Sequence, residues 1–247
     1  MSLTASQVEE FRRTGHLTVP AVFDPGEMDE AIAEIERWGE EFLVHLPQDQ
    51  RRWYVDAGVT AREVLRKLDN PHHHRAAIRQ LACDARLLQL VERLIGGGVS
   101  VCFSQIFFKA PGGGGPKPAH QDNFYFGPRD PDALVTAWIA LDDATSENGC
   151  MSFGEGTHRG PVIAHVAPPG EPFNLQIAAD VAARIATTPA PVPKGGVSFH
   201  HGGVLHQSGT NHSKRWRRAC ALHYVRNDNA FVNPALPYDE TVFLRVS

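Results

Sequence analysis

Two histidines and one aspartate carry the strongest chemical signal in this sequence. His120 and Asp122 stand two residues apart in His120-Gln121-Asp122, and His206 follows much later in the chain. Residues two apart in an extended strand point to the same face, so this imidazole and this carboxylate can bind one ion. If a second strand brings His206 beside them, the three side chains leave three positions of a metal open, as in non-haem Fe(II) oxygenases.

The tripeptide alone is a weak motif, because the chain has 13 histidines. His200 and His201 precede Gly202-Gly203 and could replace His206 as a ligand. His72-His73-His74 follow a proline and are predicted to lie in a solvated turn, and His158 is predicted to be structural.

Further motifs lie around these residues, and together they resemble the phytanoyl-CoA dioxygenase family in order and spacing. The motifs are Phe11-Arg-Arg-Thr-Gly15-His-Leu-Thr-Val-Pro20, Gln105-Ile-Phe-Phe-Lys109-Ala-Pro111, Thr136-Ala-Trp138, Glu147-Asn-Gly-Cys-Met151, Gly156-Thr-His158, His206-Gln-Ser208-Gly-Thr-Asn211 and Arg217-Arg-Ala219. The resemblance runs over nearly the whole chain, and several independent motifs agree.

This resemblance implies one domain over residues 1–247 with a mainly β fold, a double-stranded β-helix of the cupin-like jelly-roll type with N-terminal helices. It also implies Fe(II) on His120, Asp122 and His206, with 2-oxoglutarate and O₂ as cosubstrates. The implied reaction hydroxylates a small organic substrate and releases succinate and CO₂.

A basic residue downstream of His206 fits the cosubstrate. Segment 209–216 is predicted to be a hairpin loop, which would start a strand at Arg217 beside the strand of His206. A guanidinium there can hold the distal carboxylate of 2-oxoglutarate with two parallel hydrogen bonds. Ser208, two residues past His206, lies on the same face and can donate its hydroxyl to that carboxylate.

Alternation along 217–225 distinguishes Arg217 from its neighbour. Arg217 shares a face with Ala219, Ala221 and His223, whereas Arg218 shares the opposite face with Cys220. The prediction is therefore that Arg217, and not Arg218, binds the cosubstrate.

By the same resemblance, Gln105, Trp138 and Lys67 match residues that contact 2-oxoglutarate. Their ordinary interpretations are a polar strand residue, a core residue and a solvated helix lysine, respectively. We expect the substrate to meet Asn123, Phe124 and Tyr125, just past the metal motif, and the proline-rich segment 159–195.

One departure from the family and two other functions remain open. Glu155 stands in Gly154-Glu155-Gly156-Thr157-His158, where members usually have Pro-Gly-Ser/Thr-His, which puts local loop shape and substrate selection in doubt. A zinc-type metallohydrolase or a non-catalytic metal-binding jelly-roll protein would use the same ligands. Zinc hydrolysis, however, has no use for Arg217 at its spacing.

The elements that position these residues change in character near residue 98. Before it, Thr4-x-x-Gln7 and Asp24-Pro25-Gly26-Glu27 begin two helices, and residues 60–95 are predicted to be helical up to Gly96. After it, hydrophobicity alternates as in a strand. The predicted strands are 99–109, 119–126, 133–142, 150–153, 196–200, 204–208 and 217–225, with Asn148-Gly149 as a tight hairpin between two of them.

Composition agrees with a folded intracellular protein. The 247 residues carry a formal net charge of −4, which argues against a strongly basic nucleic-acid binder. The N-terminus shows no signal segment, and no apolar run reaches membrane-spanning length, so a soluble, cytoplasmic protein is expected. The four cysteines show no Cys-x-x-Cys pair and are expected to be free, buried thiols. The oligomeric state stays open.

Overall fold

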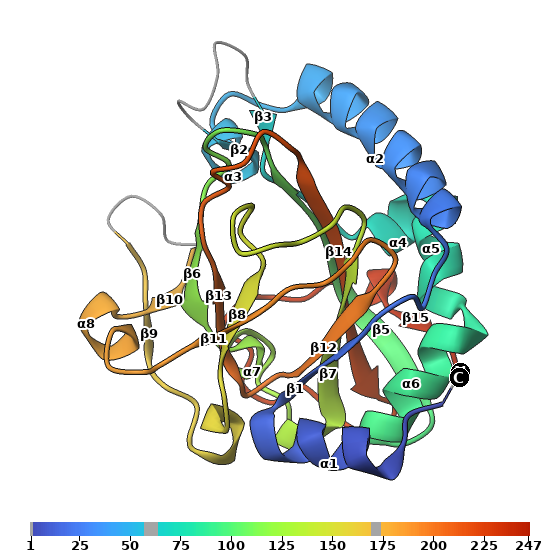
Figure 1. Ribbon diagram of the computed structural model, residues 1–247, viewed down its shortest axis with the longest axis vertical. Coiled ribbons are helices and arrows are strands. Elements are labelled where there is room, and N and C mark those ends of the chain that lie inside the picture. Colours follow the sequence, from blue (N-terminus) through green and yellow to red (C-terminus); the bar gives the residue numbers. More distant parts are fainter. Residues whose placement is uncertain (1, 57–63, 169–173) are drawn as a thin grey trace.

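Two antiparallel sheets face each other in the computed structural model, which describes residues 2–56, 64–168 and 174–247 (Figure 1). The larger sheet has the order β1 (His16–Val19), β12 (Val197–His201), β7 (Leu134–Ala140), β14 (Arg217–Arg226), β5 (Val99–Lys109) and β15 (Leu244–Arg245), and β4 (Lys67–Asp69) also pairs with β5. The smaller sheet has the order β11 (Thr188–Ala190), β8 (Met151–Gly154), β13 (Leu205–Ser208) and β6 (Lys117–His120). The predicted jelly roll is confirmed, and the single domain stays a prediction.

Short elements complete the architecture. Two-stranded pairs form between β2 (Val55–Asp56) and β3 (Val64–Leu65), and between β9 (His165–Val166) and β10 (Gln176–Ile177). The helices are α1 (Ala5–Thr14), α2 (Pro25–His45), α3 (Arg51–Tyr54), α4 (Pro71–His74), α5 (Ala76–Cys83), α6 (Ala85–Ile95), α7 (Asp122–Phe126) and α8 (Ala179–Ala182), with 3₁₀ turns η1 (Pro131–Ala133), η2 (Thr157–Arg159) and η3 (Glu240–Val242). None of the described helices is long and apolar enough to cross a membrane.

The N-terminal helices cover the outer face of the larger sheet (Figure 1). Both predicted N-terminal capping boxes are present, at Thr4 for α1 and at Asp24 for α2. Gly15 ends α1 at a φ of 85°, a left-handed conformation that favours glycine. Helix α6 buries one stripe of side chains at helical spacing, which are Leu87, Leu90, Val91 and Ile95.

Strand alternation separates the helix-covered face from the face between the sheets. In β7, Val135, Ala137 and Ile139 join the core beneath the helices, whereas Trp138 and Ala140 pack between the two sheets. Because both faces are covered, all seven residues of β7 are buried. The face between the sheets is where the functional side chains gather.

Three local predictions were wrong in informative ways. Segment 64–69 forms β3 and β4 rather than helix, because β4 adds to the edge of β5 with Leu68 opposite Ile106. The predicted strand 119–126 ends at His120, and α7 begins two residues later at Asp122. His72 is not solvated: its side chain is buried, with Nδ1 2.6 Å from Ser104 Oγ and Nε2 2.7 Å from the Val242 carbonyl oxygen.

The two predicted hairpins connect different sheets instead. Asn148 and Gly149 form a turn between β7, in the larger sheet, and β8, in the smaller one. Segment 209–216 likewise leads from β13 to β14 in the opposite sheet, so Arg217 starts a strand facing that of His206 rather than beside it. Jelly rolls alternate the chain between their two sheets, and residue spacing along the chain does not show this.

The cysteine prediction was wrong at one position. Cys83 is exposed, whereas the other three cysteines are buried, as predicted.

Candidate metal and cosubstrate site

His120, Asp122 and His206 meet between the sheets. His120 is the last residue of β6 and lies directly opposite His206 of β13 in the strand ladder, and Asp122 is the first residue of α7. Asp122 Oδ1 lies 3.8 Å from His120 Nε2 and 3.7 Å from His206 Nε2. All three side chains are buried, and their ligand atoms lie within 4.8 Å of one another. The three donor atoms therefore converge on a common point.

Backbone carbonyls orient both imidazole rings. His120 Nδ1 lies 2.8 Å from the Pro118 carbonyl oxygen, and His206 Nδ1 lies 3.1 Å from that of Val204. Because a carbonyl only accepts, each Nδ1 carries the proton and each Nε2 presents its lone pair. Burial lowers the pKa of His206 to about 3 and that of His120 well below its ordinary value, so both rings are neutral, as a metal ligand requires.

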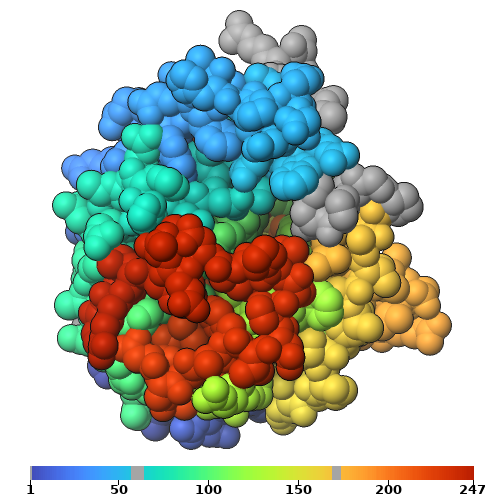
Figure 2. All heavy atoms as spheres, turned by 180° about the vertical axis from the view of Figure 1, so that it is seen from behind, coloured from blue at the N-terminus to red at the C-terminus, as the bar shows by residue number. Residues whose placement is uncertain are grey.

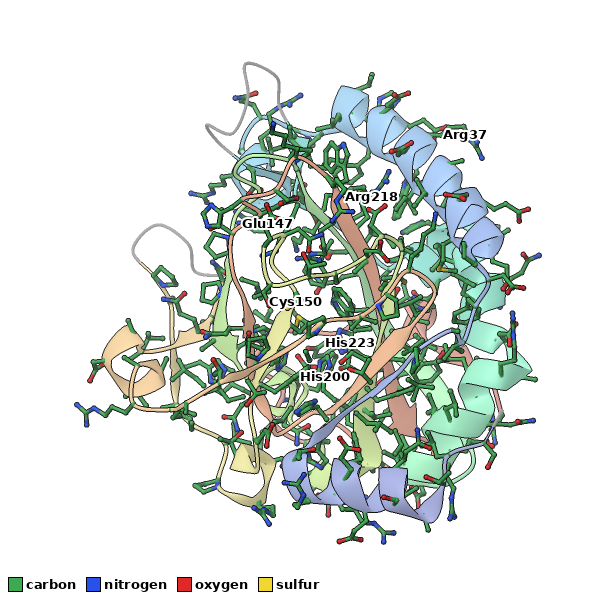
Figure 3. All side chains as sticks on the ribbon, in the orientation of Figure 1. Arg37, Glu147, Cys150, His200, Arg218 and His223 are labelled. Atoms are coloured by element: carbon green, nitrogen blue, oxygen red, sulfur yellow. The ribbon has the colours of Figure 1, made fainter. Side chains whose placement is uncertain are left out.

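The second oxygen of Asp122 is occupied by protein donors. Thr136 Oγ1 donates to Asp122 Oδ2 at 2.6 Å, and His200 Nε2 lies 3.3 Å from the same oxygen. His223 Nδ1 lies 2.8 Å from Thr136 Oγ1 and donates to it, because the hydroxyl proton already points to Asp122. Figure 3 shows His200 and His223 in the interior between the sheets. These contacts leave Oδ1 free to face the two ligand histidines.

Ionisation of Asp122 follows from the same surroundings. Burial opposes the charged form, but the hydrogen-bonding side chains around the carboxylate, those of His200 and His223 among them, hold the pKa of Asp122 well below its usual range. The sequence prediction missed the roles of Thr136, His200 and His223. A usable signal existed, because alternation places Thr136 on the face of Trp138 and His223 on the face of Arg217.

Arg217 is buried in the facing sheet with unpaired hydrogen-bond donors. Its side chain lies against Trp138, with Cζ 5.4 Å from the ring centroid. Nε and Nη1 are buried and lack hydrogen-bond partners within the described chain. Burial lowers the pKa of Arg217 only to about 10, so the guanidinium stays charged at neutral pH. A buried cation with free donors points to an anionic ligand.

Arg218 points the other way, as alternation predicted. Its Nε lies 2.7 Å from Asp142 Oδ2, and its guanidinium also pairs with Glu36 of α2, toward which it turns in Figure 3. Both carboxylates lie outside the space between the sheets. The register of β14 therefore places only the first arginine in the interior.

A cavity of about 620 Å³ joins the predicted residues, and Arg217, Ser208, Trp138, Gln105 and Lys67 all line it together with the three convergent donors. Gln105 Nε2 donates to Asp69 Oδ1 at 2.7 Å, and Lys67 Nζ lies 2.9 Å from Asp69 Oδ2. Lys67 is thus a half-buried strand residue and not a solvated helix lysine. Ala221 of β14 lies opposite Gln105 of β5 and Trp138 of β7 and also lines the cavity. Its small side chain fills little of the space between them.

Only one of the three predicted substrate residues lines the cavity. Tyr125 does, whereas Asn123 turns to the Pro131 carbonyl oxygen and Phe124 stacks on His165. The physical reason is that residues 122–126 form a helical turn, in which successive side chains rotate by about 100° instead of alternating.

Other parts of the chain form the rest of the wall. Within the described part of segment 159–195, Asn174 lines the cavity. Glu155, which lies before that segment, does not line the cavity; its Oε1 lies 3.6 Å from His16 Nε2. Segments near Tyr54 and Tyr238 also contribute. Figure 2 shows the light-blue and red segments meeting on one face, with green atoms of the sheets visible between them.

Comparisons with known proteins agree with this geometry. The family model described as phytanoyl-CoA dioxygenase (PhyH) matches residues 11–219. A probable alpha-ketoglutarate-dependent hypophosphite dioxygenase of Stutzerimonas stutzeri is 28% identical over 230 residues, covering 91% of this chain and 79% of the relative. The peroxisomal phytanoyl-CoA dioxygenase of Bos taurus is 31% identical over 145 residues, covering 56% of this chain and 43% of that protein.

A solved structure extends the likeness to the fold. The epimerase SnoN in complex with Fe³⁺, alpha-ketoglutarate and nogalamycin RO is 25% identical, with a TM-score of 0.73. The match covers 94% of this chain and 86% of SnoN. The metal and 2-oxo acid named for that protein correspond in type to the donors and the unpaired guanidinium found here.

Proposed function

Because this chain belongs to the phytanoyl-CoA dioxygenase family and is an Fe(II)- and 2-oxoglutarate-dependent oxygenase, we propose that it hydroxylates a small organic substrate at this cavity. In this proposal His120, Asp122 and His206 hold Fe(II). Bound iron would supply the O₂ chemistry, in which oxidative decarboxylation of 2-oxoglutarate to succinate and CO₂ accompanies transfer of one oxygen atom to the substrate.

The donor set fits ferrous iron. Two neutral imidazole nitrogens and one carboxylate oxygen form the ligand set typical of non-haem Fe(II) oxygenases, which leaves positions for cosubstrate and O₂. The hydrogen bond from Thr136 to Asp122 Oδ2 favours binding through Oδ1 alone. A carboxylate held in this way does not close a further metal position.

The buried guanidinium of Arg217 is the observation that carries the proposal. Its unpaired Nε and Nη1 suit the distal carboxylate of 2-oxoglutarate, a planar anion that accepts two parallel hydrogen bonds. Trp138 orients the guanidinium from one face, and Ser208, buried on β13, offers a hydroxyl to the same carboxylate. A zinc hydrolase would give this arginine no function.

The remaining walls orient the substrate and exclude water. Phe103, Tyr125 and Phe126 line the cavity on the side of α7, and their rings present apolar surface near the ligand atoms. Excluding water there limits side reactions of the activated iron. We assign Tyr125 to substrate contact, together with the ring-rich wall around Tyr238.

We also propose that the enzyme works in the cytoplasm on small molecules and not on nucleic acid. All four cysteines are free thiols, which is typical of a reducing compartment. The net charge of −4 supports a small-molecule substrate over a polyanion.

Removing each ligand side chain tests the proposal. His120→Ala, Asp122→Ala and His206→Ala should each lose iron after desalting and stop 2-oxoglutarate-dependent succinate formation, while the melting temperature confirms a folded protein. His201→Gln is the matched control, because His201 is a buried neighbour that pairs with Asp132 outside the cavity. Near-normal activity of any ligand variant at limiting iron would remove that residue from the site.

A further inference from the structure

Lys117 places an ammonium group in the cavity with only one polar contact. It lies on β6, opposite Ser208 of β13. Its Nζ donates to Asn174 Oδ1 at 3.3 Å and lies 5.8 Å from the centroid of the Tyr125 ring. Within residues 2–56, 64–168 and 174–247, no carboxylate oxygen forms an ion pair with this group.

The other cations of the cavity are held more closely. Lys67 pairs with the carboxylate of Asp69. Lys109 donates to two backbone carbonyl oxygens, those of Ser208 and Gly209, and Arg66 Nε donates to the Trp53 carbonyl oxygen at 3.0 Å. Lys117 has one long hydrogen bond to a neutral side-chain amide. Because an ammonium group has three N–H donors, Lys117 can donate further hydrogen bonds to a ligand.

The charges around Lys117 favour an anion. Burial, followed by repulsion from Lys67 and Arg66, lowers the pKa of Lys117 to about 8. A negative group beside it would raise this pKa again and would be attracted by Lys117, Lys67 and Arg66 together. Asp122 and Asp69 act on Lys117 in the opposite direction, but more weakly.

Tyr125 relates this cation to the iron ligands. Its ring centroid lies 5.8 Å from Lys117 Nζ and 5.9 Å from the ring centroid of His120. These two distances together are below 12 Å, so the ammonium lies within about 12 Å of that imidazole. A small molecule can contact both at once in a cavity of about 620 Å³.

We propose that Lys117 binds a single anionic group of the substrate, a carboxylate or a phosphonate, and so directs a carbon on the other side of Tyr125 toward the iron. This inference rests on the proposed function. It names the substrate class as small organic monoanions and makes Lys117 a specificity-determining residue. Arg217 stays reserved for the cosubstrate, because it lies on the facing sheet against Trp138.

Calorimetric titration of the protein loaded anaerobically with Fe(II) and 2-oxoglutarate tests it. The probes are hexanoate, hexylphosphonate and benzoate, each compared with a neutral counterpart: hexanamide, diethyl hexylphosphonate and benzamide. We expect at least one anion to bind at least tenfold more tightly than its counterpart. Lys117→Met should abolish this preference and Lys117→Arg should retain it. Lys214→Met is the matched control, because Lys214 is exposed and outside the cavity.

Three results would overturn the inference: no anion binds, neutral counterparts bind equally well, or Lys117→Met keeps the preference. A fourth is a tenfold weaker 2-oxoglutarate affinity in Lys117→Met, which would assign the lysine to the cosubstrate instead. Failure of the proposed function looks different, because wild-type protein would then show no iron-dependent binding of 2-oxoglutarate. The same probes titrated into metal-free wild-type and Lys117→Met proteins would still report on Lys117, because Arg217 is present in both.

Discussion

Replacing Arg217 by lysine isolates the geometry of the guanidinium from its charge. In the wild-type protein Nε and Nη1 are buried, unpaired and adjacent to Trp138. Lysine keeps the positive charge but offers a single ammonium in place of two parallel donors. The variant should therefore retain one of the two proposed hydrogen bonds to the distal carboxylate of 2-oxoglutarate.

The size of the effect follows from the bond that is lost. A hydrogen bond to a charged group contributes about 1.5–3 kcal/mol. Since 1.4 kcal/mol corresponds to a tenfold change, Arg217→Lys should raise the Kd of 2-oxoglutarate by about 10- to 150-fold. Iron affinity should not change, because the arginine is not a metal ligand.

The assay is an anaerobic titration of Fe(II)-loaded protein that follows the visible charge-transfer band of the 2-oxo acid chelate. Arg218→Lys is the control, because Arg218 pairs with Asp142 and Glu36 outside the cavity. A second control is 2-oxobutanoate, which lacks the distal carboxylate and should bind both variants and wild type within about twofold. Equal weakening in both lysine variants, or equal weakening for both 2-oxo acids, would refute the reasoning.

Two further predictions concern buried polar contacts. Thr136→Val removes the donor to Asp122 Oδ2 and should lower metal affinity by about 10- to 100-fold, measured by competition with a chelator, whereas Thr136→Ser should restore it; equal affinity in both variants would contradict this role. Burial lowers the pKa of His72 from 6.5 to about 4. Between pH 6.5 and pH 4 the side chain is therefore neutral in the folded protein and protonated in the unfolded protein. The free energy of unfolding should fall by up to about 3 kcal/mol as the pH drops through this range. Urea denaturation of His72→Asn should show a shallower fall over this range, and an unchanged slope would exclude His72 as its source.

Much of the site was predictable because short-range rules decide it. Alternation alone separates Arg217 from Arg218, since β14 stays regular where both faces are buried. The capping boxes at Thr4 and Asp24 likewise depend on residues three apart. In each of these cases the interacting groups are close in the sequence, so local backbone geometry suffices.

Other features depend on where the chain turns. Gly127 ends α7 at a φ of 56°, and the amide of Asn123 donates to the Gly202 carbonyl oxygen, so the chain leaves β6 as a helical turn. This turn directs Tyr125 into the cavity and Asn123 and Phe124 away from it. The strand prediction for residues 119–126 was wrong, but the prediction that His120 and Asp122 lie together was right. The helical turn that follows β6 still places both side chains beside His206.

The sequence by itself predicted the three side chains that converge between the sheets, the jelly-roll class and the inward face of β14. Only the tertiary structure decided that Thr136, His200 and His223 surround one oxygen of Asp122, that His72 is buried, and that Lys117 meets Asn174. The physical reason is that an isolated side chain has no burial and no partner until distant strands pack. Those partners come from both sheets and from segments far apart in the chain, so their positions depend on the closed fold rather than on any local pattern.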